Sequence, residues 1–89
     1  MATKTWKIGE RAIGGIIKVT ITGNVVTIQA LDYCSKKEVE SKEFNGELND
    51  SYWAIGDYLD YLSTSYHENI IHDWILTKIN DKNKPLFRY

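Results

Sequence analysis

The dipeptide Gly23-Asn24 constrains the fold of this 89-residue chain more than any other feature, because two regular apolar–polar alternations meet at it. The flanking segments are 16–22 (IIKVTIT) and 25–31 (VVTIQAL). Glycine takes the positive φ that the first central position of a type II′ turn requires, so the spacing predicts a β-hairpin. A two-residue loop also sets the register, with Val19 opposite Ile28. In this register one face of the hairpin is wholly apolar and carries Ile17, Val19, Ile21, Val26, Ile28 and Ala30.

The second half of the chain predicts two helices. The first is expected at 52–62, after Asp50 or Ser51 as the N-cap residue. The second is expected at 65–79, where Ser65-x-x-Glu68 has the spacing of a capping box. One continuous bent helix over the same residues is the alternative.

Two further strands complete the predicted sheet. Residues 3–8 predict a short first strand, and the charged segment 37–44 is typical of an edge strand, where charge discourages aggregation. An antiparallel sheet with one apolar face needs a cover, which two amphipathic helices supply. We therefore expect an α+β fold, in which a four-stranded antiparallel sheet with the hairpin 16–31 at its centre is followed by two helices packed on one face. Residues 1–89 are expected to form one domain, with 80–89 as a partly ordered C-terminal tail.

The overall composition indicates a soluble globular protein. Hydrophobic residues make up 43% of the chain and charged residues 26%, and the net charge is −1. No apolar run approaches the roughly 20 residues of a membrane helix, and the N-terminal residues have no apolar signal region. Cys34 is the single cysteine, so an internal disulfide cannot form. These features favour a reduced, cytoplasmic setting without a membrane.

Both histidines lie in the stretch SYHENIIHDWI, residues 65–75, which is one residue longer than the zinc-binding pattern H-E-x-x-H. With i, i+5 spacing, His67 and His72 point about 140° apart on a regular helix, so they cannot share a metal. His67 is predicted to be half-buried, and His72 to lie on the solvated side, four residues after Glu68. Cys34 has no nucleophile signature around it. We therefore predict no enzyme activity, no catalytic residues, no metal and no cofactor. The predicted apolar stripe of this helix contains Ile70, Ile71, Trp74 and Ile75.

The helix predicted at 52–62 carries the candidate binding surface. Its inward stripe is expected to contain Tyr52, Ile55, Leu59 and Leu62. On the opposite side lie two aromatic residues and two carboxylates, namely Trp53, Asp57, Asp60 and Tyr61. Tryptophan and tyrosine anchor protein interfaces, and carboxylates around them attract a basic partner. Asp50 and Asp73 are expected to add supporting charge, since residues 50–73 contain no Lys or Arg.

Three other uses of these residues stay open. Trp53 could instead pack beneath the C-terminal tail, against Leu86 or Phe87. The same helix face could form a homodimer. Direct nucleic-acid binding is a weaker alternative, because the polar face of the hairpin offers few cations, Lys18 among them, and no interleaved aromatic residues.

The chain also resembles small phage-encoded anti-CRISPR proteins. The resemblance covers residues 1–79 and consists of size, layout and four segments: MATKTWKIG, GGIIKVTITGNVVTIQAL, KKEVESKEF and YWAIGDYLDYLSTSYHENIIHDWI. It implies a non-catalytic inhibitor in the cytosol of a bacterial host that binds a CRISPR-Cas effector and blocks nucleic-acid binding or activation. The alternatives are a small structural or oligomeric phage or bacterial protein, or a weak nucleic-acid-binding module.

Overall fold

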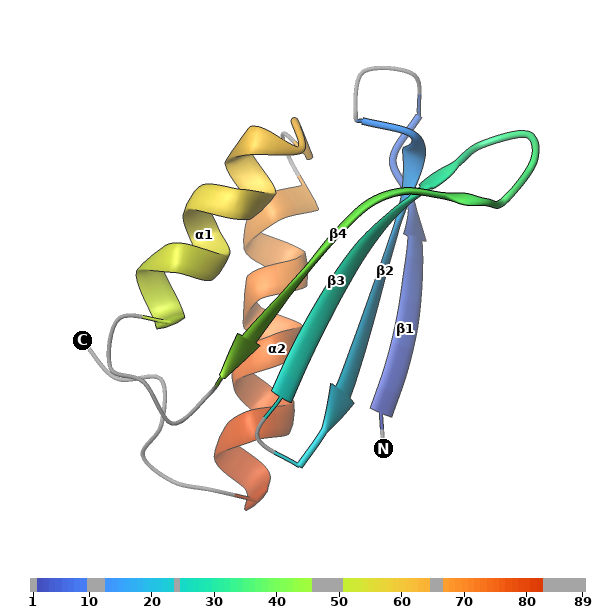
Figure 1. Cartoon of the computed structure of the whole chain (residues 1–89). Coiled ribbons are helices and arrows are strands. Elements are labelled where there is room, and N and C mark those ends of the chain that lie inside the picture. The colour runs from blue at the N-terminus through green and yellow to red at the C-terminus, as the bar shows by residue number, and fades with distance from the viewer. Residues whose placement is uncertain (1, 10–12, 24, 46–50, 65–66, 83–89) are drawn as a thin grey trace.

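The computed structural model describes residues 2–9, 13–23, 25–45, 51–64 and 67–82, with side chains at all of these except 51, 52 and 79–82. Four antiparallel strands form one sheet in the order β1-β2-β3-β4, and two helices follow and lie on one face of it (Figure 1). This confirms the predicted α+β fold. The elements are β1 Ala2–Lys7, β2 Gly15–Thr22, β3 Val25–Asp32, β4 Glu38–Asn45, α1 Ser51–Tyr61 and α2 Glu68–Lys82.

The central hairpin has the predicted register. Thr22 pairs with Val25 across the turn, and Val19 pairs with Ile28. Gly23 has a φ of 59°, which is the positive value that the turn requires. Asn24 lies outside the described residues. The register is set locally, because a two-residue loop leaves the two strands only one way to align.

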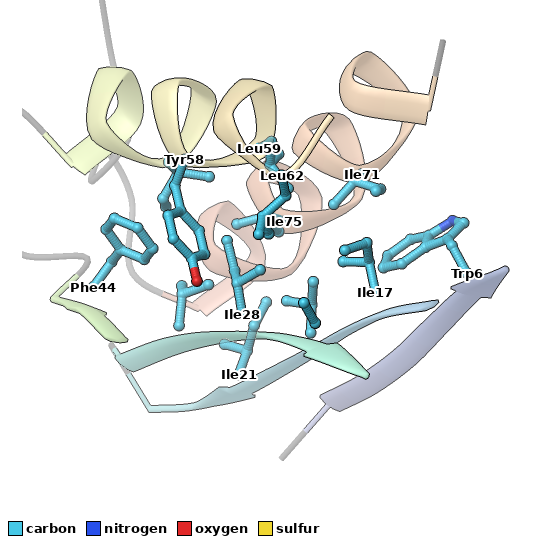
Figure 2. Packing of buried hydrophobic residues seen from close by; sticks show 14 residues of the cluster. Trp6, Ile17, Ile21, Ile28, Phe44, Tyr58, Leu59, Leu62, Ile71 and Ile75 are labelled. Atoms are coloured by element: carbon cyan, nitrogen blue, oxygen red, sulfur yellow. The ribbon is translucent and has the colours of Figure 1, made fainter. Parts of the chain in front are cut away.

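The apolar face of the hairpin forms the sheet side of the core. All six of its predicted side chains are buried, and helix residues cover them (Figure 2). Full burial of one such aliphatic side chain contributes about 1.5–3 kcal/mol. Trp6 closes one end of the core with an edge-on contact to Trp74, with ring centroids 5.5 Å apart. The helices contribute Ile55, Tyr58, Leu59, Ile71 and Ile75, and Leu62 follows directly after α1.

Two helix positions differ from the prediction. Tyr58 is buried against Phe44, with ring centroids 5.8 Å apart, although the inward stripe of α1 was predicted without it. The placement of Ile70 in the apolar stripe of α2 is wrong, because its side chain is 56% exposed. Ile71 and Ile75 are fully buried, so the inward face of α2 is centred between them and Ile70 lies about 120° away. The side chain of Tyr52, also predicted to face inward, lies outside the described set.

The two helices are separate, and the alternative of one bent helix is wrong. Ser63 adopts a φ of 62°, and its N–H donates to the carbonyl of Asp60 at 2.9 Å. The N–H and the hydroxyl of buried Thr64 both donate to the carbonyl of Leu59, at 3.3 and 3.1 Å. This is a Schellman-type ending, which satisfies the last carbonyls of α1 and turns the chain.

The second helix begins later and ends later than predicted. His67 precedes Glu68 in a 3₁₀ conformation, and α2 runs to Lys82, so it includes residues 80–82 of the predicted tail. Ser65 of the proposed capping box and residues 83–89 lie outside the described residues.

Candidate functional site

Three of the predicted site residues lie together in a hollow between the helices. Trp53, Asp57 and Asp60 project from α1 toward the first turns of α2, and the hollow has a volume of about 360 Å³. We call it the interhelical groove, and it is lined by Trp53, Gly56, Asp57, Asp60, Glu68, Asn69 and His72. The α1 residues recur at a spacing of three or four, so one helix face supplies them all.

Gly56 lies at the floor of this groove, where α1 and α2 approach each other. A Cβ atom placed there would lie 3.4 Å from Cε1 of His72, so the imidazole packs against the glycine backbone. His72 is therefore half-buried, and its predicted solvated position is wrong. His72 lies about 80° from the centre of the inward face between Ile71 and Ile75, on the side of α2 that α1 covers. His67 is half-buried, as predicted.

The charges of the groove are all of one sign among its described lining residues. Asp57 and Asp60 are exposed, whereas Glu68 is half-buried. Burial first, and then the negative charges of Asp60 and Asp57, raise the pKa of Glu68 above its ordinary value. In the part of the chain that the structure describes, no Lys or Arg lines the groove. The groove thus holds concentrated negative charge that a cation from another molecule would relieve.

Replacing Asp60 by asparagine should lower the pKa of Glu68 toward its ordinary value. A raised carboxyl pKa disfavours folding at high pH, so the free energy of unfolding falls as pH rises from the ordinary Glu value through the raised one. Asp60→Asn should reduce that fall. It should also raise the free energy of unfolding at pH 7 by about 0.2–0.5 kcal/mol, which is the size of one screened like-charge contact. Carboxyl NMR titration and urea unfolding would measure both effects. Asp73→Asn is the control, and an equal change in that variant would contradict the assignment.

Tyr61 lies in a different hollow, on the side of α1 that faces β4. This second hollow has a volume of about 620 Å³, and we call it the β4–α1 groove. The hydroxyls of Tyr61 and Tyr58 each donate to the Glu40 carboxylate at 3.2 Å, and their rings stack with centroids 5.9 Å apart. The groove is lined by Glu40, Ser41, Lys42, Ala54, Asp57, Tyr58 and Tyr61.

The tyrosines of the β4–α1 groove act as hydrogen-bond donors. Burial and the Glu40 charge raise the pKa of Tyr58, and the hydrogen bond to Glu40 raises the pKa of Tyr61. Both hydroxyls therefore stay protonated at neutral pH. The Lys42 ammonium lies 5.7 Å from the centroid of the Tyr58 ring. The alternation of β4, which places Glu40 and Lys42 on the side of buried Phe44, is the sequence signal for this cluster.

The remaining predicted residues lie elsewhere. Asp73 is exposed on α2 and lines neither groove. Asp50 lies outside the described residues, as do Leu86 and Phe87, the predicted cover of Trp53. The Trp53 side chain is 62% exposed. Within the described residues, no group of histidine, cysteine and carboxylate side chains could hold a metal ion.

Comparisons with protein families, with curated proteins and with solved structures found no match. No described helix is long and apolar enough to cross a membrane.

Proposed function

We propose that this chain is a non-catalytic binding protein whose interhelical groove receives basic side chains of a protein partner. The observation that carries the proposal is a largely exposed Trp53 beside the three carboxylates of Asp57, Asp60 and Glu68. Burial, and then the charges of the other two carboxylates, raise the pKa of Glu68. An indole next to carboxylates suits a guanidinium or ammonium group, since the ring face and the negative charges both attract it.

The electrostatics of the groove favour capture of such a cation over a purely structural role. A carboxylate held among like charges destabilises the free protein slightly. A bound cation would remove that repulsion. The relief favours the complex, and the folded protein without a partner does not have it. Trp53 would supply the apolar contact area that anchors an interface.

Basic surfaces of this kind are typical of proteins that hold nucleic acid, because phosphate binding requires Lys and Arg. We propose that the partner is such a protein and that occupation of its basic surface blocks nucleic-acid binding or activation. The resemblance to small phage-encoded anti-CRISPR proteins makes a CRISPR-Cas effector the first candidate, and the host cytosol the place of action.

Reversing two charges tests this proposal. Asp57→Lys combined with Asp60→Lys should weaken partner binding by at least about 100-fold, since close charge pairs across an interface are worth several kcal/mol. The measurement is capture of purified CRISPR effectors, and of proteins from a bacterial lysate that expresses them, by the immobilised chain.

The matched control reverses two carboxylates on the sheet face away from the helices. Glu38→Lys with Glu43→Lys changes the net charge equally but leaves both helices untouched, and it should retain capture. Far-UV circular dichroism would check that both variants fold. Equal capture by the two double variants would contradict the proposed site.

A further inference from the structure

The edge of the sheet at β4 is a second candidate surface, which shares Asp57 with the interhelical groove. Within the described residues β4 pairs with β3 alone, so its other side is an edge (Figure 1). The β4–α1 groove opens along this edge, and Tyr61, which is 57% exposed, lies over it. An edge strand presents backbone N–H and C=O groups that can pair with another strand.

The charges of β4 select what can pair with it. Glu40 and Lys42 are two residues apart, so both project to the helix side of the sheet, where they pair with Ala30 and Ile28. Between them, Ser41 projects to the opposite side and is exposed. In an antiparallel pair of two β4 strands centred on Ser41, Glu40 of each copy lies opposite Lys42 of the other.

We infer that β4 pairs with β4 of a second copy of this chain, antiparallel, about a twofold axis through Ser41. Two reciprocal Glu40–Lys42 contacts form in this arrangement, and the two sheets join into one. Both copies keep their helices on the same face, since a twofold axis perpendicular to the sheet preserves its sides. Such a closed twofold dimer is the commonest symmetric assembly of soluble proteins.

The neighbouring registers are unfavourable, which makes the inference specific. A pair centred on Lys42 brings two ammonium groups together, and a pair centred on Glu40 brings two carboxylates together. Like charges directly opposite each other destabilise a strand pair. β4 carries three carboxylates (Glu38, Glu40 and Glu43) and one ammonium group (Lys42), so two β4 strands repel each other. Only a register that places Glu40 opposite Lys42 offsets this repulsion.

The β4–α1 groove and its two tyrosines suit a second β4 strand as the occupant. Ala54, Asp57, Tyr58 and Tyr61 recur on α1 at the spacing of one helix face and look over the edge of β4. A second β4 strand would extend the sheet beneath this face and cover part of exposed Tyr61. Glu40 already accepts hydrogen bonds from both tyrosine hydroxyls, so its carboxylate is held in place for a cation from the partner.

Complementary charge variants test the register directly. Sedimentation equilibrium of the unmodified chain should show a monomer–dimer equilibrium that shifts with concentration. Glu40→Lys leaves only cations on the paired face, and Lys42→Glu leaves only carboxylates, so each variant alone should dimerise at least about 10-fold more weakly. An equimolar mixture of the two should form a heterodimer, because every contact is then between unlike charges.

Ser41 supplies a variant that leaves the Glu40 hydrogen bonds intact. Ser41→Glu places two carboxylates opposite each other at the axis and should give a monomer, whereas Ser41→Thr should dimerise as the unmodified chain does. Circular dichroism would check folding, and the Ser41 pair decides the result if Glu40→Lys does not fold. A strictly monomeric chain at all concentrations up to 1 mM, full dimerisation of Ser41→Glu, or no heterodimer from two folded monomeric variants would each overturn the inference. Partner capture is tested at Asp57 and Asp60 and dimerisation at Glu40, Ser41 and Lys42, so the failure of one proposal is distinguishable from the failure of the other.

Discussion

Replacing Ile71 by alanine is expected to lower the free energy of unfolding by about 2–5 kcal/mol, because it removes a fully buried side chain and leaves a cavity. The same substitution at the neighbouring Ile70 should change that free energy by less than about 0.5 kcal/mol, since a surface substitution loses no packing. Ile70 is 56% exposed, and alanine is the better helix former. For a small domain the first loss is a large share of the total stability.

Urea unfolding of both variants, followed by circular dichroism, measures this difference. The two positions are adjacent on α2 and carry the same side chain, so each is the control for the other. Equal losses would contradict the orientation of α2, and would favour the broader apolar stripe that the sequence alone predicted.

A second large effect is expected at Gly14. Its φ is 74°, and a Cβ atom there would lie 2.6 Å from the carbonyl oxygen of Leu31. Alanine would therefore add left-handed strain of about 1–2 kcal/mol, and the backbone of β2 or β3 would also have to move. We expect a total loss of about 2–4 kcal/mol in the free energy of unfolding.

Gly56→Ala is the matched substitution with the opposite expected sign. Gly56 is helical, and its nearest neighbour to a new Cβ is the His72 ring at 3.4 Å, an ordinary contact. Alanine should stabilise α1 by about 0.5–1 kcal/mol, as expected for a helix interior. Thermal unfolding of both variants gives the signs, and a destabilised Gly56→Ala variant would show that the interhelical groove does not tolerate even a methyl group.

The strands were predictable to within one residue at every end, because their signals are local. Alternation fixes which side chains share a face, and the Gly23-Asn24 turn fixes how β2 and β3 align. The inward face of α1 was predictable in the same way at Ile55, Leu59 and Leu62, all fully buried. Each of these predictions uses residues close together in the sequence.

The candidate site was predictable only in part. Trp53, Asp57 and Asp60 were predicted to project outward together, and they do line one groove. Glu68 and His72 were not grouped with them, because the approach of α2 to α1 depends on the turn at Ser63 and on contacts between distant residues. Tyr61 shares the β4–α1 groove with Asp57, one of its predicted neighbours, but its hydrogen-bond partner Glu40 was not predicted, since it lies 21 residues earlier in the chain.

The sequence by itself therefore determined the α+β class, the hairpin register and the outward, acidic-aromatic character of α1, since short-range periodicity and turn geometry encode them. Only the tertiary structure decided which side of α2 is buried, and how α1 divides its outer residues between the interhelical groove and the β4–α1 groove. Those outcomes depend on how two helices and an edge strand pack together. The packing contacts join residues distant in the chain, and no local pattern records them.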